Sequence, residues 1–137
     1  MCKNDFDEVF APVTRLETVR LLLALAAKNM WEVHHLDVKT AFLNGEIGEE
    51  VYVTQPEGFI KKGKENQVYR LIKALYGLRQ APRAWYSKLN KCLEDLGFIR
   101  CPYEHAVYVR RKGNEAIIIG VYVDDLLITG TDISLIK

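Results

Sequence analysis

The sequence predicts an α+β fold in which helices pack on one face of a mainly antiparallel sheet. Two stretches carry apolar residues at helical spacing, and they alternate with short runs rich in β-branched and aromatic residues. Short connections with turn residues join the later runs, which favours hairpins. A length of 137 residues fits one domain with a single core.

The composition is that of an ordinary globular chain, with 49% hydrophobic and 27% charged residues. The net charge of +1 gives no reason to expect a nucleic-acid or membrane partner from overall charge. Three cysteines without C-x-x-C spacing favour a reducing compartment over a disulfide framework or a zinc site. We therefore expect a soluble intracellular protein with no membrane partner, in a cytoplasmic particle or in the nucleus.

The first helix is expected to begin at Thr14, whose hydroxyl would cap it while Glu17 completes a capping box. It should end near Asn29 and be followed by a short strand over residues 33–38. An irregular stretch with the turn signal Asn44-Gly45 comes next.

Residues 51–53 and 67–72 are expected to pair as strands. A second helix should start at Pro82, place Trp85 in the core and stop at Gly97. The remaining expected elements are strands over 106–110, 116–123 and 126–129, a turn at Gly113-Asn114, and the first turn of a further helix over 132–136.

Two adjacent acids, Asp124 and Asp125, interrupt the otherwise apolar run of residues 117–128. Two ionised carboxylates in such a place repel each other and lose solvation unless a cation such as Mg²⁺ compensates them. Two residues is the commonest hairpin loop, so this pair is expected to form the turn between two strands. The alternative, a solvated hairpin tip, stays open because aspartate is common in turns.

A third acid, Asp37, lies at the end of the strand expected over 33–38. If that strand neighbours the hairpin, three carboxylates converge, and hard divalent cations favour such oxygen ligands. The alternative is an ordinary strand-end aspartate.

Three segments, in this order, resemble the successive palm motifs of copia-type reverse transcriptases. They are residues 36–45 (LDVKTAFLNG), 74–86 (ALYGLRQAPRAWY) and 122–125 (YVDD), and the similarity is nearly continuous from residues 6–13 to the last residues. The resemblance implies a catalytic Asp-Asp hairpin and RNA-directed DNA synthesis, in which a primer 3′-hydroxyl attacks a deoxynucleoside triphosphate at a two-metal site.

By the same resemblance, Asp37, Asp124 and Asp125 are the catalytic residues. They would hold two Mg²⁺ ions, for which Mn²⁺ could substitute, together with the backbone carbonyl of Val38. Phe42 would lie under the incoming sugar and exclude a 2′-hydroxyl, the alternative being a core aromatic residue. The further implied contacts are Gln80 for the nucleotide and Arg79, Ala81, Pro82, Tyr122 and Val123 for template and primer.

The implied partners are an RNA template, a DNA or RNA primer, deoxynucleoside triphosphates, and the remaining fingers, thumb, ribonuclease H and integrase segments of a Pol polyprotein. Residues 66–93 carry six basic and no acidic residues with aromatic residues among them, which favours nucleic-acid binding independently. The resemblance implies that residues 1–137 are a single partial palm domain, truncated at both ends. We expect weak or no activity from it alone, and exposed apolar surface at residues 21–23 and 117–119.

Two other classes of function remain open. A metal-dependent nuclease or phosphatase could use the same three carboxylates, and incorporation of nucleotide rather than release of phosphate would distinguish the polymerase from it. A non-catalytic nucleic-acid-binding module could share the fold and the basic segment, but it has no use for a buried pair of aspartates.

Overall fold

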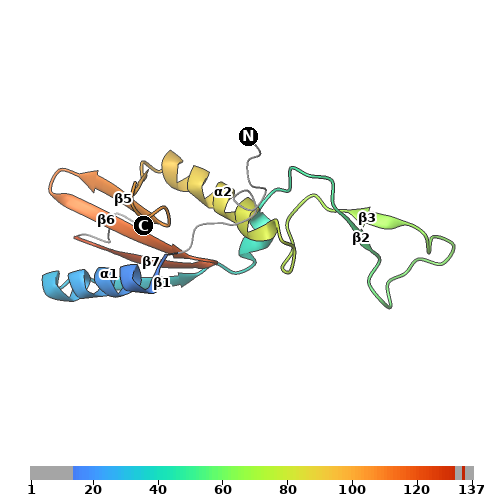
Figure 1. The fold of residues 1–137 in the computed structure, drawn as a ribbon, viewed down its shortest axis with the longest axis horizontal. Coiled ribbons are helices and arrows are strands. Elements are labelled where there is room, and N and C mark those ends of the chain that lie inside the picture. Colours follow the sequence, from blue (N-terminus) through green and yellow to red (C-terminus); the bar gives the residue numbers. More distant parts are fainter. Residues whose placement is uncertain (1–13, 132–133, 135–137) are drawn as a thin grey trace, which may run out of the picture.

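The computed structural model describes residues 14–131 and 134, and this part of the chain forms two α-helices, a five-stranded sheet and a separate two-stranded arm (Figure 1). The α+β class and the mainly antiparallel sheet are confirmed. The elements in chain order are α1 (Leu16–Asn29), β1 (Val33–Asp37), the 3-10 helix η1 (Ala41–Asn44), β2 (Tyr52–Thr54), β3 (Val68–Arg70), α2 (Ala81–Asp95), β4 (Ile99–Arg100), β5 (Val107–Lys112), β6 (Glu115–Tyr122) and β7 (Asp125–Gly130).

The strands of the large sheet lie in the order β1-β7-β6-β5-β4, and every neighbouring pair is antiparallel. The first strand of the sheet therefore pairs with the last. η1 and β4 were not predicted. The expected similarity over residues 6–13 lies outside the described residues, and of the helical turn expected over 132–136 only residue 134 is described.

Helix α1 begins at Leu16, and the capping box expected at Thr14 is wrong. The cap position is Arg15, without a side-chain hydrogen bond to the helix. The Thr14 hydroxyl instead donates toward two backbone carbonyls, at 2.8 Å from the Val121 oxygen on β6 and 3.3 Å from the Ala106 oxygen just before β5. Thr14 thus fastens the start of α1 to the sheet and is almost fully buried there. The helix ends at Asn29, as expected.

Helix α2 begins at Ala81, so the expected Pro82 lies in its first turn. Its end follows the expectation, because Gly97 has a φ of 86° in the left-handed region that glycine tolerates best. The amides of Gly97 and Phe98 donate to the Glu94 and Leu93 carbonyls and so close the helix.

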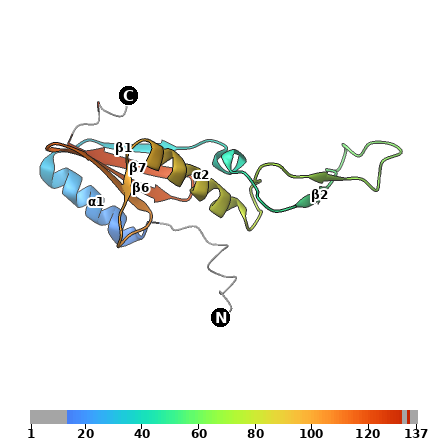
Figure 2. The same ribbon diagram turned by 90° about the horizontal axis from the view of Figure 1, so that it is seen from above.

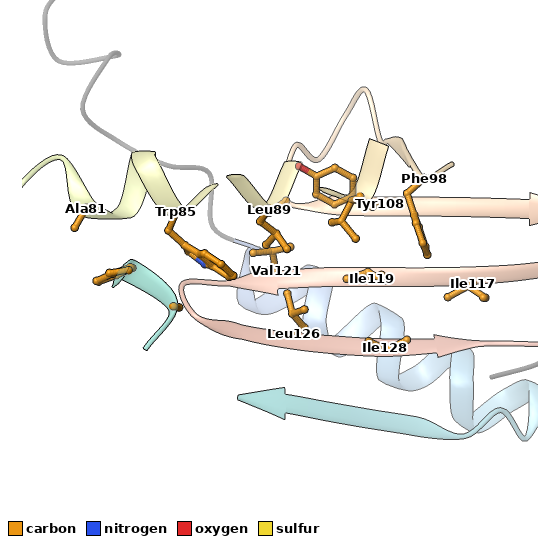
Figure 3. Packing of buried hydrophobic residues seen from close by; sticks show 14 of the residues in the cluster. Ala81, Trp85, Leu89, Phe98, Tyr108, Ile117, Ile119, Val121, Leu126 and Ile128 are labelled. Atoms are coloured by element: carbon orange, nitrogen blue, oxygen red, sulfur yellow. The ribbon is translucent and has the colours of Figure 1, made fainter. Parts of the chain in front are cut away.

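The main core lies between α2 and one face of the large sheet. Trp85, Leu89 and Leu93 on α2 are at most 7% exposed. Figure 3 shows Trp85 and Leu89 pointing toward the strands. Their partners on the sheet are alternate residues of β6 and β7: Ile117, Ile119, Val121, Leu126 and Ile128. The exposed surface expected at residues 117–119 is therefore wrong for Ile117 and Ile119, which are 2% and 4% exposed beneath α2. Ile118, which points to the other face, is half-buried.

Helix α1 covers the opposite face of the sheet, so the expectation that helices pack on one face is wrong. Gly120 alternates with Ile119 and Val121 along β6 and therefore faces away from α2. A Cβ at Gly120 would lie 3.2 Å from the Cδ1 atom of Leu22 on α1. The absence of a side chain at Gly120 thus leaves space for the Leu22 side chain of α1. Of the residues expected to be exposed at 21–23, Leu21 and Leu23 are exposed, whereas Leu22 is buried, with 7% of its surface exposed.

The pair β2–β3 forms an arm that stands away from the large sheet (Figures 1 and 2). The expected pairing of these two segments is confirmed, with β3 shorter than predicted. Much of the apolar surface of the arm and its flanking residues is exposed, at Tyr52, Phe59, Ile60, Val68, Tyr69 and Ile72. No helix in the described part of the chain is long and apolar enough to cross a membrane.

Candidate active site

The β6–β7 hairpin has a two-residue loop, as expected, but the loop is one residue earlier than predicted. Tyr122 and Asp125 pair across the strands, so the loop consists of Val123 and Asp124, which we call the aspartate turn. Asp125 is the first residue of β7 rather than a loop residue. Val123 has a φ of 55°, in the left-handed region that β-branched residues rarely adopt.

The sheet brings Asp37 to Asp125. These residues are direct partners in the register of β1 and β7, and directly opposed residues of an antiparallel pair point to the same face. That face is opposite to α2, because Leu126 and Ile128 point toward α2 and alternate with Asp125. Asp124 lies next to this pair, in the aspartate turn. The backbone thus places the three predicted carboxylate residues at one end of the sheet.

The carboxylate groups of these three aspartates do not converge, although their backbones are neighbours. No three histidine, cysteine, aspartate or glutamate side chains among residues 14–131 and 134 form a group that could hold a metal ion. The carboxylate of Asp125 instead lies 2.9 Å from Nε2 of His35, and both side chains are partly exposed. His35 was not among the predicted site residues, although its position two residues before Asp37 on the same strand places it on the same face.

Two hydrogen bonds from distant segments hold the aspartate turn. The indole N–H of Trp85 donates to the Val123 carbonyl at 2.9 Å, and the amide of Val38 donates to the Asp124 carbonyl at 3.0 Å. The carbonyl of Val38, which the resemblance assigns to a metal ion, accepts a hydrogen bond from the Ala41 amide at 3.1 Å. That oxygen keeps a second lone pair for another ligand.

The predicted nucleotide and template residues lie on η1, on the first turn of α2 and at the hairpin end. Phe42 is buried, and its ring centroid is 4.5 Å from that of Tyr76, so its ring packs in the core. The side-chain amide of Gln80 donates to the Glu49 carboxylate at 3.4 Å. The other predicted contact residues range from exposed to buried: Arg79, Tyr122 and Val123 are exposed, Pro82 is half-buried, and Ala81 is fully buried.

The six basic residues between positions 66 and 93 are all exposed, on β3, in the following loop and on α2. Arg70 forms an ion pair with Glu50 at 3.5 Å. Exposed basic residues are thus present both on the arm and on α2, the helix that supports the aspartate turn.

Helix α2 is also joined to β5 by a buried tyrosine. The Tyr108 hydroxyl lies 2.7 Å from Oδ1 of Asn90 and 3.0 Å from the hydroxyl of Tyr86, both on α2. Burial raises the pKa of Tyr108 well above its ordinary value, and the hydrogen bond with Tyr86 raises it further. The neutral phenol is therefore the form that the folded chain favours.

The chain is similar to parts of retrotransposon polyproteins. It is 47% identical over 133 residues to the Retrovirus-related Pol polyprotein from transposon TNT 1-94 of Nicotiana tabacum, covering 96% of this chain and 10% of that protein. It is 44% identical over 133 residues to the corresponding polyprotein from transposon RE2 of Arabidopsis thaliana, covering 97% and 9%. The putative transposon Ty5-1 protein of Saccharomyces cerevisiae is 44% identical over 93 residues, or 68% of this chain and 30% of that protein.

The chain thus spans about a tenth of the length of the first two relatives. No solved structure matches it. The family model described as "Reverse transcriptase (RNA-dependent DNA polymerase)" matches residues 1–137, which confirms the resemblance drawn from the three motifs. The chain belongs to the reverse transcriptase (RNA-dependent DNA polymerase) family.

Proposed function

We propose that residues 1–137 are a partial palm domain of the RNA-directed DNA polymerase in a copia-type Pol polyprotein. The domain would take part in transfer of a deoxynucleoside monophosphate to a primer 3′-hydroxyl on an RNA template. The observation that carries this proposal is the register that sets Asp37 directly opposite Asp125, with Asp124 in the adjoining turn.

The chemistry of Asp37, Asp124 and Asp125 suits a divalent metal ion, and their side chains would turn toward one another to hold it, since in the described part of the chain they form no such group as they lie. Carboxylate oxygens are the ligands that Mg²⁺ and Mn²⁺ prefer, and two like charges directly opposed on neighbouring strands destabilise the sheet unless a cation compensates them. Asp37 and Asp124 would hold two Mg²⁺ ions, Asp125 would exchange its contact with His35 for an ion, and the Val38 carbonyl would complete the set. Bound ions would lower the pKa of the primer hydroxyl and stabilise charge that develops on the phosphoryl group.

The neighbouring residues would position the nucleic acid and the nucleotide. Phe42 would bound the site below the sugar, and its packing against Tyr76 would keep its ring in place. Gln80 would contact the nucleotide, while template and primer would lie along Arg79, Ala81, Pro82, Tyr122 and Val123. Since the chain spans about a tenth of its relatives, we propose that other Pol segments supply most of the grip on template and primer. The chain alone would then extend primers weakly or not at all.

The experiment compares Asp124→Asn with Asp95→Asn, the same chemical change at an exposed residue at the end of α2. Mn²⁺ binding is measured by electron paramagnetic resonance, and incorporation of labelled dNMP is measured on a primed RNA template. We expect Asp124→Asn to weaken Mn²⁺ binding on the order of 10-fold or more, whereas Asp95→Asn leaves it unchanged.

The incorporation assay is run on the 137-residue chain and on a longer Pol segment that contains it. In the longer segment, incorporation should depend on Asp124 and not on Asp95. Release of phosphate or cleavage of the template without incorporation would refute the polymerase assignment and favour a nuclease or phosphatase. Equal Mn²⁺ affinity in the wild type and in Asp124→Asn would refute the proposed metal site.

A further inference from the structure

The aspartate turn is held from outside the hairpin at both of its carbonyl groups. Trp85 on α2 donates to the Val123 carbonyl, and Val38, the residue after β1, donates to the Asp124 carbonyl. The two donors lie in different segments that are far from the turn in sequence. The position of the turn is thus determined by tertiary contacts and not by the hairpin alone.

The turn needs such contacts because its own residues do not stabilise it. Val123 is β-branched and adopts a φ of 55°, a conformation that persists only when the surrounding structure enforces it. Its side chain is 39% exposed, so burial does little to anchor it. A hydrogen bond to its carbonyl is therefore the contact best placed to keep Val123 in this conformation.

Trp85 is well suited to provide that hydrogen bond. Its side chain is 7% exposed and packs in the core, beside the end of the β6–β7 hairpin (Figure 3). The backbone at Trp85 is fixed as well, because Gly45 approaches so closely that a Cβ there would lie 2.7 Å from the Trp85 nitrogen. The donor is thus held in place before it meets the turn.

We infer that Trp85 is a positioning residue of the candidate active site: its indole N–H fixes the Val123 carbonyl and thereby holds Asp124 beside Asp37 and Asp125. The inference rests on the proposed role of Asp124 as a metal ligand. A tryptophan that served only the core would need its ring but not its N–H. The two roles therefore differ in how they respond to removal of the N–H alone.

The test uses the 137-residue chain with Trp85 replaced by β-(3-benzothienyl)alanine, which has the same ring size and a sulfur in place of N–H. Trp85→Phe is the second variant. The control is Tyr86→Phe, which removes a hydroxyl on α2 that makes no contact with the aspartate turn. That hydroxyl donates to the His105 carbonyl at 3.0 Å and accepts from Tyr108 at 3.0 Å and Arg100 at 3.2 Å. The hydrogen-exchange rate of the Val38 amide reports how stably that amide is bonded to the Asp124 carbonyl of the aspartate turn. The Kd for Mn²⁺ reports whether the carboxylates keep the arrangement that binds the metal ion.

Loss of one hydrogen bond should raise the exchange rate of the Val38 amide about 2- to 10-fold in both Trp85 variants. The Kd for Mn²⁺ should rise by a similar factor, and Tyr86→Phe should change neither quantity. If the Val38 amide exchanges at the wild-type rate in the benzothienyl variant, the inference is overturned. If Trp85→Phe does not fold, the benzothienyl variant alone decides between the two outcomes. Faster exchange with an unchanged Kd would make Trp85 merely structural and would also overturn it.

Failure of the proposed function gives a different result. In that case the wild-type chain binds no Mn²⁺, while exchange of the Val38 amide still responds to the Trp85 variants. This outcome would support the hold of Trp85 on the turn and overturn the metal site.

Discussion

Substitution of Gly45 by alanine is expected to destabilise the chain at the contact between η1 and α2. Gly45 directly follows η1, where the chain passes against the first turns of α2. A Cβ at this position would lie 2.7 Å from the Trp85 nitrogen and 2.8 Å from the Ala84 carbonyl carbon. Both atoms belong to the helix backbone, so no side chain can rotate away, and η1 and α2 must separate.

The magnitude follows from two opposing terms. Forcing an extra carbon into a packed contact costs about 1–3 kcal/mol, and the reduced freedom of alanine in the unfolded chain returns about 0.4–1 kcal/mol. The free energy of unfolding should therefore fall by about 1–2 kcal/mol. For a domain of this size, that corresponds to a Tm lower by about 3–10 °C.

Gly48→Ala is the matched control, because a Cβ at Gly48 meets nothing within 4 Å and its φ is not in the left-handed region. Its free energy of unfolding should stay within about 0.5 kcal/mol of the wild type. Urea denaturation followed by circular dichroism measures both variants. If Gly45→Ala proves as stable as Gly48→Ala, the close approach of η1 to α2 is not a feature of the folded chain.

Two further predictions concern the face of α2 that packs on the sheet. Leu89→Ala should lower the free energy of unfolding by about 2–4 kcal/mol, since Leu89 is 7% exposed, whereas its exposed neighbour Lys88→Ala should have almost no effect in the same urea titration. Tyr108 keeps its proton in the folded state above pH 10 while the unfolded chain loses it, so stability falls as pH rises through this range. Tyr108→Phe should be less stable than the wild type below pH 9, because it loses the hydrogen bonds to Asn90 and Tyr86. Above pH 10 this difference in the free energy of unfolding should narrow, because only the wild type loses stability as the pH rises. A difference that does not change with pH would contradict the assigned burial of the phenol.

The helices and most strands could be predicted because their signals are local. Gly97 ends α2 by its own backbone freedom, and the apolar residues of α2 recur at helical spacing whatever they pack against. Thr14 shows the limit of local signals. Its hydroxyl suits a helix cap, but the carbonyl groups of Ala106 and Val121 compete for it, and the sequence does not reveal that competition.

The hairpin shows why the site was predicted only approximately. With the predicted loop at residues 124–125, Val121 would pair with Ile128, whereas with the observed loop at 123–124 it pairs with Leu126. The two pairings differ by two residues along β7. A shift by two residues leaves each side chain on the same face, so both pairings keep Val121 and Leu126 on the α2 side. Hydrophobic alternation cannot distinguish these registers. The contacts that Trp85 and Val38 make with the turn are specific to the observed one.

One residue in the sequence could have indicated that helices pack on both faces of the sheet. Gly120 interrupts a run of large apolar residues in β6, and a glycine inside a strand commonly marks the close approach of another segment. Leu22 of α1 occupies the space that this glycine leaves. The glycine could have predicted a close neighbour, although not which helix provides it.

The pairing of the first strand with the last has a consequence for how the chain folds. The partners in β1 and β7 are roughly 90 residues apart in sequence, so the edge of the sheet closes only after a long loop has been ordered. Contacts of such high sequence separation slow folding. During synthesis β1 leaves the ribosome long before β7 exists, so the backbone groups of β1 that pair with β7 in the folded chain stay without that partner until then. Completion of the aspartate site is therefore a late event in folding, because Asp37 meets Asp125 only when the final strand joins the sheet.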